Sequence, residues 1–278
     1  MIRIVTDSSS DLPAEILERH RITVVPLTIR FGLENLVDGE ELSVDDFWNR
    51  LTAAEDLPET AAPAVGLFQE AYRDLSNAGA DGIVAVTISA GISATHQAAV
   101  LAAEQLTSGI PVRVIDSRLV SAALGLCVLE AARAAEAGGT IDEVEAAARG
   151  AVATSNLFAA LDTLEFLKRG GRIGGTAALF GGLLDIKPLI TFGDGVVRPG
   201  GRVRTRRKAV QAVLDRLDSL ESVVEVGVVH SDPPDLDWFL DALGERGHGN
   251  PIVARLGPVV GTHAGPGVIG VVYRVSKQ

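Results

Sequence analysis

The sequence is poor in cysteine and in aromatic residues. Its 278 residues include a single cysteine, Cys127, so neither an internal disulfide nor a multi-cysteine metal site can form. This cysteine usage is typical of the reducing cytoplasm, where we expect the protein to be located. Aromatic residues make up only 4% of the chain, which argues against a stacking surface for nucleotide bases.

Positive charge is also scarce. The chain has 25 Lys and Arg against 36 Asp and Glu, a formal net charge of −11. A chain this acidic is a poor general binder of nucleic acid, so we expect no nucleic-acid partner. The five histidines are scattered along the sequence, so no metal site is expected.

Export signals and membrane spans are not expected either. An aspartate follows the first apolar run at Asp7, before the apolar region of a signal peptide could form. Residues 256–273 lack charged side chains and are numerous enough to cross a bilayer. They include five glycines and two prolines, so we interpret them as a strand, a loop and a strand.

The first half of the chain alternates β-rich runs with helical periodicity. Strands are predicted at 2–5, 22–31, 82–88 and 112–115. Helices are predicted between and after them, the longest at 119–137, with capping signals at Ser43 and Thr140. This alternation predicts an α/β domain whose parallel sheet is flanked by helices.

The pattern changes after about residue 155. Predicted strands at 157–161 and 186–192 lead to Asp194-Gly195, a hairpin signal. Helices at 206–220 and 236–246 alternate with further predicted strands at 223–229, 252–256 and 268–275. We therefore expect an N-terminal domain, 1–155, and a C-terminal domain, 156–278, with a mixed or antiparallel sheet and helices.

A polar loop at residues 87–95 lies between a predicted buried strand and a predicted helix. Such a loop lies at the carboxyl edge of a parallel sheet, where α/β folds bind ligands. The hydroxyls of Ser89 and Ser93, the flexible Gly91 and the free N–H groups of the helix could hold an anion. The alternative is that Ser93 only caps the helix.

Two further segments are candidate anion-binding sites. Thr60 precedes Pro63 at what we interpret as the junction of a loop and a helix, and it could be purely structural. His263 lies in a predicted loop among Gly261, Gly265 and Gly267, which let the backbone approach a ligand closely. Its imidazole could donate to a carboxylate or a phosphate, act as a base, or have a purely structural role.

Basic residues are concentrated in two stretches of this acidic chain. The first is 168–172, which includes Arg172, and the second includes Arg202 and Arg204 within residues 198–208. Such a run usually forms a solvated face. Here it could also dock an acidic partner or a phosphate-bearing molecule.

Five segments, in this order, resemble the DegV family. They are Thr6-Asp7-Ser8-Ser9-Ser10-Asp11-Leu12-Pro13 and the segments 89–95, 114–117, 164–173 and 261–267. The resemblance extends over essentially the whole chain. It implies two α/β domains with a long-chain fatty acid in an apolar tunnel between them. It also implies that the fatty-acid carboxylate is presented to a separate ATP-using fatty acid kinase subunit, which forms an acyl phosphate.

The resemblance also implies roles for individual residues. Thr60, Ser93 and His263 match the groups that hold the carboxylate, and Arg172 matches an arginine linked to the kinase or to phosphoryl transfer. Arg202 and Arg204 match a basic stretch less closely. Ala61, Ala62, Ala90 and His96 depart from the family pattern at positions that usually hold Ser, Gln, Ser and Tyr.

A serine esterase is the alternative interpretation. Residues 91–94 resemble half of a nucleophile elbow, and Ser93, Asp232 and His263 follow in the chain order of a hydrolase triad. The elbow motif is incomplete, because Thr95 replaces its second glycine, and no oxyanion loop is recognisable. The sequence also has no recognisable nucleotide-binding motif. We therefore predict a cytoplasmic lipid-binding protein without a cofactor, rather than an enzyme in its own right.

Overall fold

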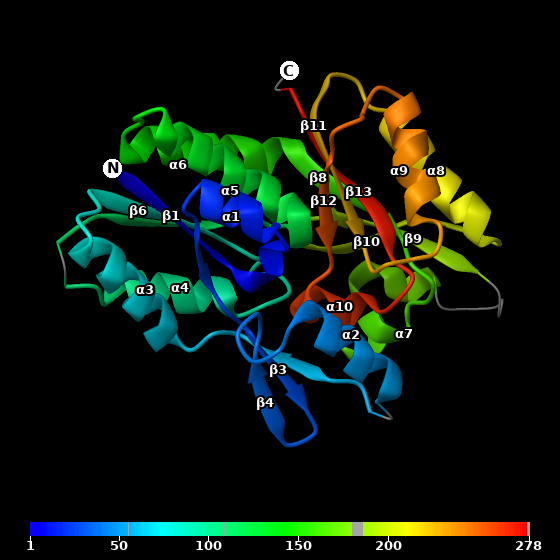
Figure 1. Ribbon diagram of the computed structural model, residues 1–278, viewed down its shortest axis with the longest axis horizontal. Helices are drawn as coiled ribbons and strands as arrows, with labels where there is room; N and C mark the ends of the chain where they lie inside the picture. The colour runs from blue at the N-terminus through cyan, green and yellow to red at the C-terminus, as the bar shows by residue number, and fades with distance from the viewer. Residues whose placement is uncertain (55, 108, 180–185, 277–278) are drawn as a thin grey trace.

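The computed structural model describes residues 1–54, 56–107, 109–179 and 186–276 (Figure 1). Its first sheet is fully parallel, with strand order β2-β1-β6-β7. The strands are β1 (Ile2–Asp7), β2 (Thr23–Val25), β6 (Gly82–Thr87) and β7 (Val112–Asp116). Four of the helices around it are α1 (Ala14–Arg19), α3 (Val65–Asn77), α4 (Thr95–Glu104) and α6 (Ile141–Thr154). The predicted parallel sheet of the N-terminal half is confirmed.

The second sheet is mixed, with strand order β10-β9-β8-β13-β11-β12. The strands are β8 (Ser155–Ala160), β9 (Lys187–Gly193), β10 (Val196–Val203), β11 (Val223–His230), β12 (Ile252–Arg255) and β13 (Ile269–Val275). Only β11 and β12 pair in parallel, and Asp194-Gly195 forms the turn of the β9–β10 hairpin. The predicted mixed sheet is confirmed. The division into domains 1–155 and 156–278 remains a prediction.

Helix α5 (Ser121–Glu136) lies between the two large sheets (Figure 1). Its first nine residues, 121–129, are all buried, which is typical of a helix packed on all sides, and its charged residues Glu130, Arg133 and Glu136 lie in the C-terminal part. Cys127 is fully buried within it. Helices α3 and α4 cover the other face of the parallel sheet, and α8 (Arg206–Asp218) and α9 (Leu236–Glu245) cover the outer face of the mixed sheet. The layers therefore alternate helix, sheet, helix, sheet, helix.

A small antiparallel sheet, which the sequence did not reveal, lies at one end of the molecule. Its strands are β3 (Thr28–Phe31), β4 (Glu34–Val37) and β5 (Glu59–Ala61). It packs with α2 (Val44–Ala53) and α10 (Pro258–Ala264). Short helices complete the chain: η1 (Ser8–Ser10), α7 (Glu165–Arg169) and η2 (Gly174–Leu179).

Three local predictions were wrong. The β-rich run 22–31 divides between two sheets at Pro26, which has no N–H to donate to a strand ladder. Thr60 lies on β5 and not at a loop-to-helix junction, because Glu59–Ala61 pairs with β3. His263 lies in the last turn of α10 and not in a loop, because Pro258 begins a helix in which Gly261 packs against Phe47.

Candidate functional site

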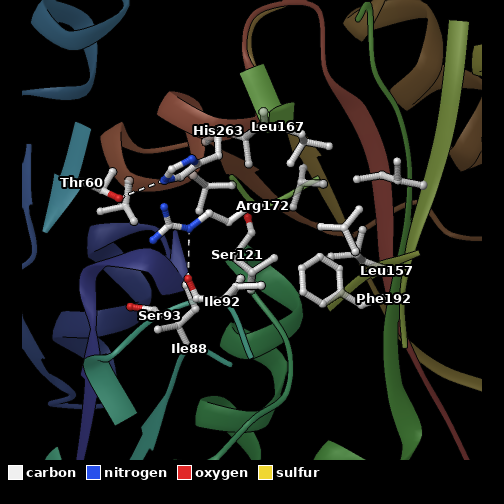
Figure 2. Close-up of a pocket in the computed structure, with 18 of the residues that line it drawn as sticks. Thr60, Ile88, Ile92, Ser93, Ser121, Leu157, Leu167, Arg172, Phe192 and His263 are labelled. Atoms are coloured by element: carbon white, nitrogen blue, oxygen red, sulfur yellow. Dashed lines mark hydrogen bonds between the residues drawn. The ribbon is translucent and has the colours of Figure 1, made fainter. Parts of the chain in front are cut away.

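An apolar cavity of about 190 Å³ lies between the mixed sheet and the carboxyl edge of the parallel sheet (Figure 2). Its wall includes residues from β5, from the loop after β6, from the start of α5 and from α10. These elements are far apart in the sequence. The loop after β6 and the start of α5 both follow strands of the parallel sheet and therefore lie at its carboxyl edge, and β5 and α10 line the cavity from other parts of the fold. The cavity is therefore a product of the tertiary fold and not of any one motif.

Alternate side chains of β8 and β9 form the apolar wall of the cavity. Leu157 and Ala159 of β8, and Ile190 and Phe192 of β9, face the cavity. The intervening Phe158 and Leu189 pack instead against α8 and α9 on the outer face. Successive side chains of a strand point to opposite faces, so one sheet supplies both the cavity wall and the outer core.

Polar side chains gather at the opposite end of the cavity. Thr60, Ser93, Arg172 and His263 all line it, and Figure 2 shows them on the side away from Phe192. Thr60 Oγ1 and His263 Nε2 are hydrogen-bonded at 2.9 Å. Ser93 Oγ is hydrogen-bonded to Thr95 Oγ1 at 2.8 Å. The three residues that the resemblance links to a carboxylate thus share one polar end.

His263 is held in its neutral form. Burial, together with the nearby Arg172 guanidinium, lowers the pKa of His263 to about 4. Its buried Nδ1 has no hydrogen-bond partner among the described residues. A Cβ at Gly170 would lie 2.1 Å from this nitrogen, so the ring fits only against a glycine. Nδ1 thus faces Gly170, and Nε2, on the side of Thr60, is the nitrogen of the neutral ring that can donate or accept a hydrogen bond there.

Arg172 lines the cavity and bonds two neighbouring backbone carbonyls. Its Nε donates to the carbonyl of Ile92 at 3.1 Å, and its Nη1 donates to the carbonyl of Gly170 at 2.7 Å. Both partners are neutral, so these bonds leave the guanidinium charge uncompensated. Among the described lining residues of the cavity, Arg172 is the one that carries a full charge at neutral pH. The polar end is therefore electropositive.

A second, polar hollow adjoins this end. It has a volume of about 580 Å³ and shares Thr60, Arg172 and His263 with the apolar cavity. Arg30, Glu59 and Arg169 are among its other lining residues. We call it the polar hollow. The three shared side chains form the partition between an apolar space and a polar one.

Two helix N-termini reinforce the positive potential. Helices α4 and α5 begin at the cavity, where Ala94 and Ser121 line it. Their N-cap residues, Ala94 and Val120, make no side-chain capping bond. At α4, Ser93 Oγ accepts from the N–H of Thr95 at 3.3 Å, so Ser93 bonds the start of this helix as well as lining the cavity. The N-terminal end of a helix carries a partial positive charge and free N–H groups, so both helices favour an anion here.

Ser121 and Asp11 are part of the site that sequence reasoning missed. Ser121 lines the cavity and its Oγ donates to Asp11 Oδ2 at 2.5 Å, while Asp11 Oδ1 accepts from the N–H of Gly257 at 3.0 Å. Burial raises the pKa of Asp11 to about 8. The available signal was Asp11 itself, a carboxyl directly before an apolar segment. Through these two hydrogen bonds Asp11 connects α5 to the start of α10, the helix that includes His263.

Ser89 and Gly91 are not in the cavity wall. Ser89 Oγ donates to the carbonyl of Gly195 at 2.6 Å in the β9–β10 hairpin. A Cβ at Gly91 would lie 2.6 Å from the same carbonyl oxygen, so only glycine allows this approach. Both residues therefore fasten the loop to the mixed sheet, and Ser93 is the serine of this loop that lines the cavity.

The remaining candidates lie elsewhere. Arg202 and Arg204 are exposed at the end of β10, outside the cavity wall. The hydrolase arrangement is not formed, because Asp232 pairs with His230 at 3.2 Å and with Arg255, while His263 bonds Thr60.

In the described part of the chain no cluster of three or more His, Cys, Asp or Glu could hold a metal ion. Within the same residues, each helix is too short or too polar to cross a bilayer.

Comparisons with known proteins agree with the fold and the motifs. The DegV family model matches residues 1–276. A DegV domain-containing protein of Streptomyces coelicolor is 42% identical, over 98% of this chain and 97% of that protein. The structure of a fatty-acid-binding DegV family protein from Thermus thermophilus has 31% identity and a TM-score of 0.90, covering 99% of each chain. A stearic-acid-binding protein from Eubacterium ventriosum has 27% identity and a TM-score of 0.89, covering 99% of this chain and 98% of that one. The chain belongs to the DegV family.

Proposed function

We propose that this protein binds a long-chain fatty acid with its tail in the apolar cavity and its carboxylate at Thr60, Ser93 and His263. The observation that carries the proposal is an apolar cavity with one electropositive polar end, where Arg172 also lies. The Thermus thermophilus and Eubacterium ventriosum proteins described above bind fatty acids, and the present chain shares their fold.

The physical chemistry of a fatty acid fits the two ends of the cavity. Burying a tail contributes about 0.8 kcal/mol per methylene, so a long chain binds tightly wherever the apolar wall excludes water. Burying an ionised carboxylate without hydrogen bonds costs far more than burying a neutral amide or hydroxyl, for which the cost is about 2–7 kcal/mol. The hydroxyls of Thr60 and Ser93 and the neutral imidazole of His263 supply those bonds.

We further propose that the carboxylate is presented to a separate ATP-using kinase subunit, which phosphorylates it to an acyl phosphate. The polar hollow supports this step, because it borders the same three side chains from the outside. In this proposal Arg172 stabilises the negative charge of the phosphoryl group during its transfer, and the exposed Arg202 and Arg204 contact an acidic partner. This chain then acts as a cytoplasmic binding subunit.

Native mass spectrometry of the purified protein tests lipid binding. We expect a mass increment equal to one long-chain fatty acid, and extraction with solvent should identify it. A protein that carries no lipid, and that takes up none when a fatty acid is added, would contradict the proposal.

The kinase step needs a separate experiment. Arg172→Ala, loaded with fatty acid and mixed with an ATP-dependent fatty acid kinase, should retain its lipid but yield at least tenfold less acyl phosphate than wild type. Arg169→Ala is the matched control, because Arg169 borders the polar hollow but not the cavity. Equal loss of lipid and of product in Arg172→Ala would assign this residue to lipid binding alone.

A further inference from the structure

The apolar end of the cavity has one aromatic side chain in its wall. Phe192 lines the apolar cavity and also a hollow of about 480 Å³ on its other side. It is the one described residue that borders both spaces. Figure 2 shows it with Leu157 at the end away from Thr60 and Ser93. The ring is therefore a partition at the place where the end of a bound tail would lie.

The hollow behind Phe192 is less apolar than the cavity, because polar and charged side chains line it together with Ile115, Leu119, Val152 and Ala153. Asp116, Arg118, Asn156 and Asp194 are among its lining residues, and Arg118 pairs with Asp194 at 3.4 Å. Burial of methylenes is favourable only against apolar surface, so a tail gains little by reaching past the ring. The boundary of the apolar cavity thus coincides with the ring of Phe192.

The position of this ring is fixed by the surrounding backbone. Phe192 is 5% exposed and is the second-last residue of β9, opposite Val197 in the ladder. The turn is held against the loop after β6, at the edge of the parallel sheet, by the bond from Ser89 Oγ to the carbonyl of Gly195. Thr191, on the opposite face, donates to the carbonyl of Leu157 at 2.8 Å. These contacts make the partition a fixed wall.

We propose that Phe192 sets the longest acyl chain that the cavity accepts. The inference rests on the proposed function, since it assigns the tail of the fatty acid to this end. Chains that end before the ring bury all of their methylenes. Each additional carbon meets the ring and has no further wall of the apolar cavity to cover, so affinity stops rising with length there.

The test uses Phe192→Ala and Phe192→Leu in delipidated full-length protein. An equimolar series of straight-chain saturated fatty acids, differing by two carbons, is added, and native mass spectrometry reports the fraction of each that is bound. We expect the preference to shift toward longer acids, by about fourfold for each methylene that the vacated space newly buries. Phe192→Leu should shift the preference in the same direction but by less. If Phe192→Ala does not fold, the result for Phe192→Leu tests the proposal.

Phe158→Leu is the matched control. Phe158 lies on the neighbouring strand β8, is also buried, and packs with α8 and α9 on the outer face. It should leave the length preference unchanged. Val197→Leu, which adds a methylene to the cavity wall beside Phe192, should shift the preference toward shorter acids.

Two results would overturn the inference. One is an unchanged length profile in both Phe192 variants, and the other is an equal loss of affinity for every acid in a folded variant. Failure of the proposed function is recognised separately, because in that case the wild-type protein binds no acid of the series.

Discussion

The two ends of the cavity are built in different ways. The apolar end is one face of a regular sheet, where alternate residues of β8 and β9 supply equivalent side chains such as Leu157 and Ile190. The polar end consists of single side chains from four separate segments, and Thr60 and His263 are 203 positions apart. Many similar side chains form the apolar end, whereas each polar group at the polar end occurs once.

This difference determines how each end should respond to substitution. Losing one methyl group from the sheet face removes a small part of a large apolar area. Losing one hydroxyl from the polar end leaves a buried partner without its hydrogen bond, which costs about 1–3 kcal/mol. Chain selection should therefore depend on the space at the apolar end, and retention of the head group on individual polar atoms.

The largest effect is expected from filling the apolar end. Ala159→Phe would project a ring from the centre of β8 into the cavity and displace about four methylenes, lowering fatty-acid affinity roughly 200-fold. Isothermal titration of the delipidated variant measures this loss. Its thermal unfolding in the absence of lipid should stay cooperative, because the ring occupies existing space. Unchanged affinity in a folded variant would place the tail elsewhere.

A smaller loss is expected at the polar end. Thr60→Val keeps the shape of the side chain but removes the hydroxyl that bonds His263 Nε2, so affinity should fall about tenfold. The same titration measures it. Thr28→Val on the adjacent strand β3 is the control and should bind like wild type. If both variants bind equally well, the hydroxyl of Thr60 does not contact the ligand.

Two serines of one loop provide a sharper comparison. Ser93→Ala should weaken binding several-fold, whereas Ser89→Ala should spare binding and lower the free energy of unfolding by about 1 kcal/mol. The reason is that Ser93 lines the cavity while Ser89 bonds the carbonyl of Gly195. Lipid titration and denaturant unfolding of each variant separate the two roles. The reverse pattern would mean that the assignments of the two serines must be exchanged.

The smallest effect on binding is expected at Asp11, which acts on the site through Ser121. Its pKa is about 8 in the folded protein against an ordinary value of 3.8, so the unfolded chain loses a proton that the folded chain keeps. Stability should therefore fall as pH rises from about 4 to about 8. Asp11→Asn removes this titration and should flatten the decline, with little change in lipid affinity.

Chemical denaturation at several pH values checks the prediction at Asp11. Asp74→Asn, on the exposed face of α3, is the control for loss of a carboxylate. An Asp11→Asn variant whose stability declines with pH as steeply as wild type would show that Asp11 is ionised in the folded protein.

Regular elements and the family motifs were predictable from the sequence. The strand-helix alternation of the first half, the Asp194-Gly195 hairpin and the caps at Ser43 and Thr140 all depend on neighbouring residues. The capping box at Thr140 is complete, with Glu143 bonding back to the Thr140 N–H. Local physical chemistry decides such features, so a local pattern predicts them.

Features that depend on distant partners were not predictable in the same way. Ser89 and Ser93 are both loop serines in the sequence, and only the approach of the β9–β10 hairpin distinguishes them. The strand at Thr60 exists because β3 pairs with it, and Gly170 is needed because His263 arrives from α10. The roles of Thr60 and His263 came from the family resemblance. Ser121, whose partner is Asp11, carried no local signal.

The most direct test of the two-ended cavity is a crystal structure of this protein with a straight-chain saturated fatty acid. We expect a carboxylate within hydrogen-bonding distance of Thr60 Oγ1, Ser93 Oγ and the His263 ring, with the terminal methyl group against Phe192. A ligand bound in the opposite direction, or outside the cavity, would contradict this expectation.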